Sequence, residues 1–287
     1  MSAIFGPAGS AEGFLKAYKS SIDMPKYLNE MGLDAFEYQC GQGVRVSDSI
    51  GAALKSKAEE YGVKLSLHAP YFISLSSVEP EKRDKSIDYI LQSAAAAKKI
   101  GAERIVIHSG SCAKISREEA LELAKDTLIR ARKAAIDAGF EDVIFCPETM
   151  GKFNQLGNLE EVLELCRLDD SFLPCIDFGH LNARTLGQVN SPEAYEHVLN
   201  EIENKLGADR LKRFHSHFSK IEYTQNGGEK RHLTFEDELY GPRFEPLMEL
   251  VAKKGLSPTF ICESAGTQDV DALAMKTCYI SELNKAL

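Results

Sequence analysis

Short apolar runs recur along the chain, and most of them follow a long amphipathic segment and a glycine. A glycine at this place suits the left-handed backbone position that closes a helix, and the runs have the length of buried strands. Two further runs, at residues 3–6 and 172–177, complete a predicted set of eight strands. The glycines that precede the other six are Gly32, Gly62, Gly101, Gly139, Gly207 and Gly255.

The segments between these runs carry signals for helix starts. Residues 116–119 and 158–161 have the spacing of capping boxes, and Ser191-Pro192 fits an N-cap followed by a proline in the first turn. Alternating strands and helices indicate parallel βαβ units, so we predict an α/β fold: one (β/α)8 TIM-barrel domain over residues 1–287. An open doubly wound sheet is the alternative, although its G-x-G-x-x-G fingerprint is missing.

Composition narrows the class of protein. With 44% hydrophobic and 27% charged residues the chain can bury a core, which excludes disorder. We expect a cytoplasmic protein, because it has neither a membrane-length apolar run nor a signal-peptide pattern, and its seven cysteines form no C-x-x-C pair. The net charge of −9 gives no general attraction to a polyanion, so nucleic-acid binding would need a local basic patch or a bound metal.

Ionisable residues end most of the predicted strands. In a parallel barrel these strand ends meet at the C-terminal mouth, where barrel enzymes carry their active sites. Gathering so many acids and imidazoles without a cation is unfavourable, because like charges and desolvation oppose ionisation. Nitrogen and oxygen donors without a cysteine predict a site for zinc, manganese or iron. The residues are Glu37, His68, His108, Glu148, Asp177, His215 and Glu263.

Two more histidines adjoin this set. His180 lies three residues after Asp177 and is a further candidate ligand from the same loop. We expect His215 and His217 to point in opposite directions, so that only one serves the site, and we assign His215. Glu37 stands apart, because its neighbours in the sequence offer no other ligand.

In their order along the chain these motifs resemble the endonuclease IV family, zinc-dependent apurinic/apyrimidinic (AP) endonucleases with a (β/α)8 fold. The resemblance spans nearly the whole chain. The motifs are His68-Ala69-Pro70-Tyr71, His108-Ser109-Gly110, Glu148 in a P-E-T-M-G stretch, Cys175-Ile176-Asp177-x-x-His180, His215, His232 and Glu263.

The resemblance implies a cofactor of two or three Zn²⁺ ions, with Mn²⁺ as another possible metal. His68 and His108 would hold the first ion, and His180 and His232 a third. Glu148 would bridge the first ion to a second, whose remaining ligands would be Asp177, His215 and Glu263.

The same resemblance implies a hydrolase that acts in base-excision repair. Glu148 and Glu263 would be its catalytic residues, and a zinc-activated hydroxide would cut the DNA backbone 5′ to an abasic site. The implied partner is damaged double-stranded DNA. We expect the protein to bind it as a monomer and not to associate with a membrane.

Departures from the family pattern affect the third ion and the DNA contacts. Lys230 stands where the family has an aspartate ligand, which Glu229 would replace by a one-residue shift, and acidic residues 236–238 replace a glycine-rich segment. We expect aromatic side chains to wedge into or stack on bases, and cations to contact phosphates. The candidate DNA-binding residues are Tyr71, Phe72, Arg184, Lys230 and Arg231.

Two alternatives stay open. Sugar isomerases and epimerases that resemble xylose isomerase bind a single divalent metal through a Glu, Asp, His, Glu set, which Glu148, Asp177, His215 and Glu263 would supply. His68, His108, His180 and His232 have no necessary place in a single-metal site, so they favour a centre of two or three metal ions instead. A barrel that binds a metal or ligand without turnover is the third interpretation.

Overall fold

All eight of the predicted runs form parallel strands in the computed structural model, which describes residues 2–285. Six of the strands end within two residues of an ionisable site candidate, and the seventh candidate, His215, begins β7. The strands are β1 (Ile4–Pro7), β2 (Ala35–Gln39), β3 (Lys64–His68), β4 (Arg104–Ile107), β5 (Ile144–Pro147), β6 (Cys175–Asp177), β7 (His215–Phe218) and β10 (Thr259–Cys262).

The strands close into a ring. Hydrogen bonding gives two four-stranded sheets, in the orders β1-β10-β7-β6 and β2-β3-β4-β5. Parallel bridges between Ala8 and Glu37 and between Glu148 and Cys175 join the two sheets at both of their edges. The predicted barrel is therefore confirmed, and the alternative of an open sheet is wrong. The assignment of all 287 residues to one domain stays a prediction.

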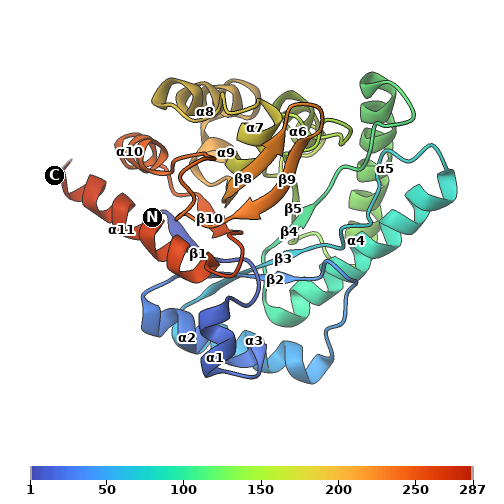
Figure 1. Ribbon diagram of the computed structural model, residues 1–287. Helices are drawn as coiled ribbons and strands as arrows, with labels where there is room; N and C mark the ends of the chain where they lie inside the picture. Colours follow the sequence, from blue (N-terminus) through green and yellow to red (C-terminus); the bar gives the residue numbers. More distant parts are fainter. Residues whose placement is uncertain (1, 286–287) are drawn as a thin grey trace.

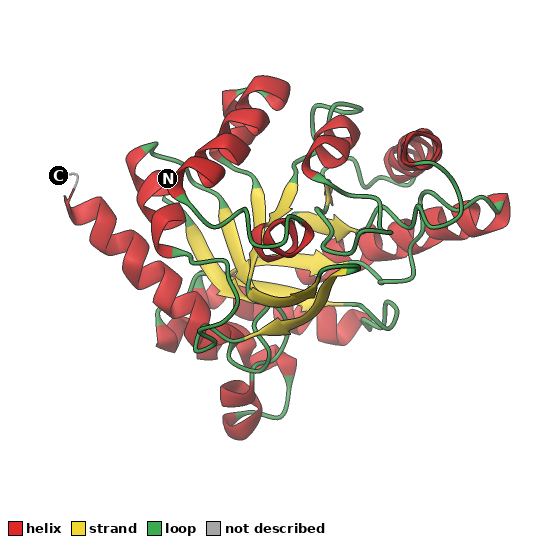
Figure 2. Cartoon of the chain, turned by 45° about the horizontal axis from the view of Figure 1, so that its top comes forward, coloured by secondary structure: helices red, strands yellow, loops and turns green. Residues whose placement is uncertain are grey.

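Helices surround the ring of strands, as Figures 1 and 2 show. Most of them connect one strand to the next and cover the outer face of the barrel. They are α1 (Glu12–Ala17), the 3₁₀ helix η1 (Ser21–Asp23), α2 (Met24–Met31), α3 (Asp48–Tyr61), α4 (Pro80–Ile100), α5 (Arg117–Asp137), α6 (Leu159–Cys166), α7 (Phe178–Arg184), α8 (Pro192–Leu206), α9 (Ala208–Lys212), α10 (Glu245–Lys253) and α11 (Gln268–Lys285).

The predicted helix starts are confirmed. Ser116 and Asn158 each form a complete capping box with the glutamate three residues later, and the Ser191 side chain caps α8 ahead of its first-turn proline. Gly207 is an exception among the predicted helix ends, because its φ of 86° and ψ of 164° are not the left-handed helical pair. The short helix α9 follows it, so β7 begins only at His215.

A hairpin absent from the sequence prediction stands over the mouth of the barrel. Strands β8 (Lys220–Thr224) and β9 (Gly228–Leu233) pair antiparallel around Asn226 and Gly227, a dipeptide that is itself a strong hairpin signal. In Figure 1 the hairpin, in orange, lies beside α7, and a bridge between Lys152 and Gly228 ties it to the loop after β5.

Apolar side chains pack in two separate places. The large cluster lies between the strands and the helices, whereas Val106, Cys146, Leu173 and Cys175 form a small cluster of their own. Val106 and Cys146 precede site residues by two positions, which puts them on the same, inward face of the barrel. Five of the seven cysteines are buried, Cys112 and Cys278 being partly exposed. Among residues 2–285, no helix is both long and apolar enough to cross a bilayer.

Candidate metal centre

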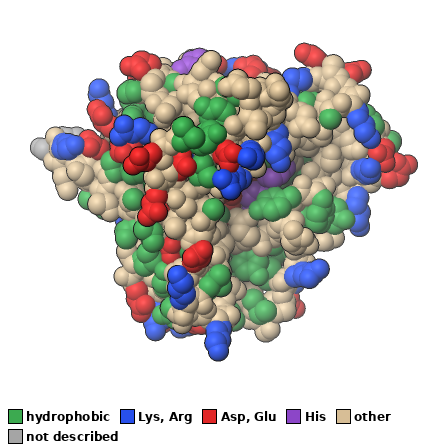
Figure 3. All heavy atoms as spheres, viewed as in Figure 1, with side chains coloured by type: hydrophobic (Ala, Val, Ile, Leu, Met, Phe, Trp, Pro, Cys, Tyr) green, Lys and Arg blue, Asp and Glu red, His purple; other side chains and the backbone are tan. Residues whose placement is uncertain are grey.

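Acids and histidines from several strand ends gather at the C-terminal mouth of the barrel. A cavity of about 530 Å³ opens there, and His68, His108, Glu148, His180 and Glu263 line it. Figure 3 shows histidine side chains inside a hollow, with basic and hydrophobic side chains beside it. The cavity therefore concentrates nitrogen and oxygen donors at the place where barrel enzymes carry their chemistry.

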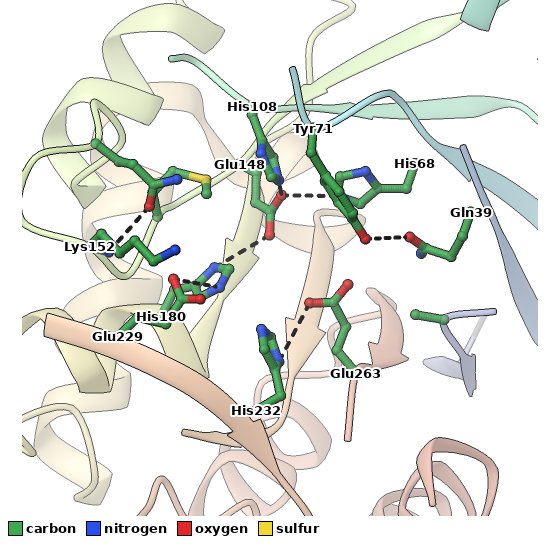
Figure 4. A pocket seen from close by; sticks show the side chains of 13 residues that line it. Gln39, His68, Tyr71, His108, Glu148, Lys152, His180, Glu229, His232 and Glu263 are labelled. Carbon is green, nitrogen blue, oxygen red and sulfur yellow. Dashed lines mark hydrogen bonds and ion pairs between the residues drawn. The ribbon is translucent and has the colours of Figure 1, made fainter. Parts of the chain in front are cut away.

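Glu148, at the end of β5, occupies the middle of this group (Figure 4). Its Oε2 lies 3.3 Å from His68 Nε2 and 3.0 Å from His108 Nε2. Its Oε1 faces the other way, 3.1 Å from His217 Nδ1 and 3.4 Å from His180 Nδ1. Burial raises the pKa of Glu148, but the neighbouring histidines lower it well below its ordinary value. The carboxylate is therefore ionised, with each oxygen turned to a different set of histidines.

A second group shares Glu148 with Asp177, His217 and Glu263, whose ligand atoms all lie within 4.8 Å of one another. Asp177 Oδ1 accepts a hydrogen bond from the backbone of His180, which caps α7, while the buried Oδ2 lies 3.1 Å from His180 Nδ1 without an aligned hydrogen bond. Burial and the charges of Glu263 and Glu148 raise the pKa of Asp177, against the opposing charge of His180. A divalent cation fits this group, because it would satisfy the orphaned oxygen and offset the repulsion.

A third group consists of His180, Glu229 and His232. Glu229 Oε2 lies 3.5 Å from His180 Nε2, and the two imidazole rings are 5.4 Å apart. The hairpin approaches closely because residue 151 is a glycine: a Cβ there would lie 2.6 Å from the Cβ of Glu229. These donors also fit a divalent cation, with two nitrogens and a carboxylate converging.

A β-bulge brings Glu229, rather than Lys230, into this group. Glu222 of β8 opposes Arg231, and the next residue of β8 opposes Glu229, so Lys230 is the extra residue. A bulge shifts the alternation of side chains by one position. Lys230 and Arg231 therefore both contact Glu222, while Glu229 turns toward His180. The one-residue shift expected from the sequence thus has a structural cause.

Hydrogen bonds to backbone and side-chain oxygens orient three of the histidines. His68 Nδ1 lies 2.8 Å from the carbonyl oxygen of Ala69, and His180 Nδ1 lies 2.9 Å from that of Thr149. His232 Nδ1 lies 2.8 Å from Ser219 Oγ. The carbonyl oxygens beside Nδ1 of His68 and His180 can only accept, so they favour the tautomer with its proton there, which leaves the Nε2 lone pair free to bind a metal.

The assignment of His215 to the second group is wrong, as is the expectation that His215 and His217 point in opposite directions. Residues two apart in a strand share a face, so both rings point into the barrel at different depths. His217 lies at the mouth beside Glu148 and Glu263, whereas His215 lies deeper, with Nε2 2.9 Å from Glu37 Oε2. Correct use of the two-residue period would have identified His217.

The candidate DNA-binding residues differ in their surroundings. Tyr71 and Phe72 are 52% and 50% exposed. Tyr71 lines the cavity and stacks on His108 at a ring distance of 5.4 Å, whereas Phe72 packs against Tyr89. The guanidinium of Arg184 instead donates to the carbonyl oxygens of residues 150, 152 and 155, so it holds this loop in place and is not free to bind a phosphate. Lys230 and Arg231 are exposed, but Glu222 neutralises part of their charge.

The sequence was compared with protein families and individual relatives. A family model described as xylose isomerase-like TIM barrel matches residues 25–277. An uncharacterized protein of Methanocaldococcus jannaschii is 34% identical over 279 residues, which are 96% of each chain. A probable endonuclease 4 of Mycoplasma pneumoniae is 31% identical over 193 residues, covering 65% of this chain and 63% of that protein. These relatives confirm the resemblance to the endonuclease IV family.

Solved structures share the fold. Endonuclease IV of Thermus thermophilus superposes with a TM-score of 0.70 at 19% identity, over 97% of this chain and 99% of that one. A D-tagatose 3-epimerase-like protein superposes with a TM-score of 0.73 at 20% identity, over 99% of both chains. At such identities the likeness establishes the barrel, and it does so equally for both kinds of protein.

Proposed function

We propose that this chain, a member of the xylose isomerase-like TIM barrel family, is a metal-dependent phosphodiesterase resembling endonuclease IV. In this proposal it is a hydrolase that cuts the DNA backbone 5′ to abasic sites during base-excision repair. It would act as a cytoplasmic monomer on damaged double-stranded DNA.

The observation that carries the proposal is the placement of the two Glu148 oxygens. One faces His68 and His108, and the other faces His217, which belongs to the group with Asp177 and Glu263. A carboxylate placed in this way suits a bridge between two cations. When bound, neighbouring divalent cations lower the pKa of a water molecule and neutralise the oxygens of a phosphodiester.

The residues of the chain divide the remaining work. Glu148, in the middle of the mouth, would contribute one oxygen to each of the two donor groups and so fix their relative position. Glu263 lies nearer the solvent, with a side chain 14% exposed, and its Oε1 lies 3.5 Å from His217 Nδ1. A carboxylate at this edge of the cavity is placed to orient a water molecule toward the phosphate and to accept its proton.

Zinc is the metal that we propose, at two or three ions per chain. The mouth offers imidazole and carboxylate donors, a combination that suits zinc and also manganese. His180, Glu229 and His232 would hold the third ion, with Glu229 in place of the aspartate that the family carries.

Recognition of the DNA would rest on aromatic side chains and on one cation of the cavity. Tyr71, in the wall of the cavity, and its exposed neighbour Phe72 can stack on bases beside a displaced sugar. Lys152 lines the cavity and can contact a phosphate. The cluster of cations would supply most of the remaining positive charge, since the net charge of the chain is −9.

The decisive experiment combines a metal count with a nicking assay. The purified protein is analysed by inductively coupled plasma mass spectrometry and incubated with a duplex that carries one tetrahydrofuran abasic analogue. We expect two or three zinc ions per chain and a single nick 5′ to the analogue, which a chelator removes and added zinc restores. An intact duplex is the control for unspecific nuclease.

Glu148→Gln is the matched variant for this assay. It keeps the shape of the side chain and removes the charge that both groups share, so we expect nicking to fall at least a hundredfold while the circular dichroism spectrum stays that of a folded barrel. Nicking at the wild-type rate by this variant would refute the bridging role. A single manganese ion and no nicking by the wild type would refute the nuclease.

A second candidate function is sugar isomerisation or epimerisation with one divalent metal. The group Glu148, Asp177, His217 and Glu263 supports it, because it contains the carboxylate, carboxylate, imidazole, carboxylate set expected for such enzymes, with His217 in place of His215. Turnover of a ketohexose with one manganese ion per chain would favour this function.

A further inference from the structure

Glu37 is a fully buried carboxylate in the interior of the barrel, below the candidate metal centre. It belongs to β2, and its neighbour across the β2–β3 ladder, Ser66, donates a hydrogen bond of 2.9 Å to Oε2. A buried carboxylate needs several donors to offset the loss of hydration. Further donors come from Gln39 of the same strand and from the opposite side of the barrel.

Two histidines of β7 face this carboxylate. His215 Nε2 lies 2.9 Å from Oε2, and His217 Nε2 lies 3.0 Å from Oε1. Gln39, two residues along β2, donates to Oε1 at 3.3 Å and accepts a hydrogen bond from Tyr71 at the cavity rim (Figure 4). Glu37 Oε1 is therefore held on the side of His217, at a fixed place in the layer below the mouth.

This placement distinguishes the two nitrogens of the His217 ring. Nε2 faces Glu37, whereas Nδ1 faces Glu148 Oε1 at 3.1 Å and Glu263 Oε1 at 3.5 Å. A neutral imidazole carries a single proton, and an acceptor on one side of the ring draws that proton to its own side. Carboxylates face both nitrogens, and the aligned hydrogen bond of the ring is the one between Nδ1 and Glu148 Oε1. A metal ion bound to Nδ1 would leave the single proton on Nε2, where Glu37 Oε1 at 3.0 Å is the nearby acceptor.

We propose that Glu37 is a positioning residue of the metal centre, which holds His217 in the Nε2-protonated tautomer so that Nδ1 can bind a metal ion. The inference rests on the proposed function, because it takes the group around Glu148 as a metal site. Glu37 itself touches neither the metal nor the substrate. Its role differs from that of a purely structural ion pair, because it determines which ring nitrogen is available.

Three variants separate these roles. Glu37→Met keeps the length of the side chain and removes both acceptors. Glu37→Gln keeps one oxygen, which Gln39 and His217 can hold at the position of Oε1. Ser66→Ala is the matched control, because it removes a hydrogen bond to the same carboxylate but leaves the acceptor beside His217 in place. All three are compared for folding by circular dichroism and thermal unfolding.

The first readout is zinc affinity, measured by competition with a chromophoric chelator, without any DNA. We expect Glu37→Met to weaken the binding of at least one zinc ion by about tenfold to a hundredfold, the range typical for loss of a residue that orients a ligand. Glu37→Gln should recover most of that loss, and Ser66→Ala should stay within about threefold of the wild type. Wild-type affinity in a folded Glu37→Met protein would overturn the inference.

The second readout uses the zinc-loaded wild type, so it does not depend on whether a variant folds. Long-range ¹H–¹⁵N correlation spectra identify the protonated ring nitrogen of His217, assigned by its loss in His217→Gln. We expect the proton on Nε2, and a proton on Nδ1 would overturn the inference. The two proposals fail differently. Zinc uptake with the wrong tautomer or an unaffected Glu37→Met refutes the role of Glu37 alone, whereas a wild type that takes up no zinc refutes both.

Discussion

The position of the β-bulge in β9 can be tested by changing Glu229 and Lys230 in turn. Glu229→Gln removes the charge of a side chain whose Oε2 lies 3.5 Å from His180 Nε2, in the group that also contains His232. Lys230→Gln alters the neighbouring residue, which pairs with Glu222 instead. If the bulge turns Glu229 rather than Lys230 toward the third site, only Glu229→Gln weakens the binding of the third ion.

The size of the effect follows from the surroundings of Glu229. Two unit charges about 4 Å apart interact by about 4 kcal/mol at an effective dielectric constant of about 20. The Glu229 side chain is 12% exposed, and the glutamine retains one oxygen donor, so part of this energy is screened or recovered. We expect a loss of about 1.5–3 kcal/mol, which corresponds to about tenfold to a hundredfold weaker binding of one ion.

The assay counts zinc per chain after dialysis against a graded series of chelator concentrations. The wild type and Lys230→Gln should lose their third ion at the same chelator concentration, and Glu229→Gln should lose it earlier while the other two ions stay bound. Loss of the ion in Lys230→Gln with retention in Glu229→Gln would refute the bulge as the cause. Identical curves for all three proteins would refute the third site.

Three further changes have defined outcomes. Arg184→Met should lower the free energy of unfolding by about 1–3 kcal/mol in urea titrations, because the guanidinium no longer donates to the loop carbonyls, and should leave DNA affinity unchanged. Tyr71→Ala should weaken the binding of an abasic duplex by about 1–3 kcal/mol in fluorescence anisotropy, without loss of zinc. Burial raises the pKa of Glu161, but Arg117 and two backbone N–H groups lower it below its ordinary value. This stabilisation is fully present above the unfolded-state pKa, so Glu161→Gln should cost about 1–3 kcal/mol at pH 7. The difference should start to shrink as the pH falls below about 4 and should continue to shrink as the pH falls through the lower folded-state pKa.

Much of the fold could be predicted because its signals are local. A capping box needs only residues three apart, as at Ser116 and Glu119, and a helix-closing glycine such as Gly62 needs only its own backbone freedom. Alternation of strands and helices then restricts the topology to a few choices. The hairpin of β8 and β9 was within reach too, since Asn226-Gly227 stands between its strands, but it interrupts the regular alternation of strand and helix.

From the pattern of the residues alone, the sequence could identify only those site residues that stand at the ends of strands. His68, Glu148 and Asp177 end their strands, and the structure gathers them at one mouth. The ligands from β9 depend instead on a register shift between two strands, which is a long-range property of the pairing. The sequence suggested Glu229 and His232 only through the resemblance to a family, and the pairing with β8 explains why Glu229 rather than Lys230 faces His180. The depth of Glu37 in the barrel is equally a matter of the closed ring, since its partners come from β7.

The choice between a nuclease and a sugar isomerase turns on His68 and His108. A mononuclear site would use the group around Glu148 Oε1 and would leave Glu148 Oε2 with two histidines at 3.3 and 3.0 Å that have no part in the chemistry. Placing two imidazoles against a ligand carboxylate would draw charge away from that single metal and compete with it for the oxygen pair. A second cation turns the same arrangement into a complete ligand set. The paired histidines therefore favour the multinuclear centre, and with it phosphodiester hydrolysis, over a single-metal isomerase.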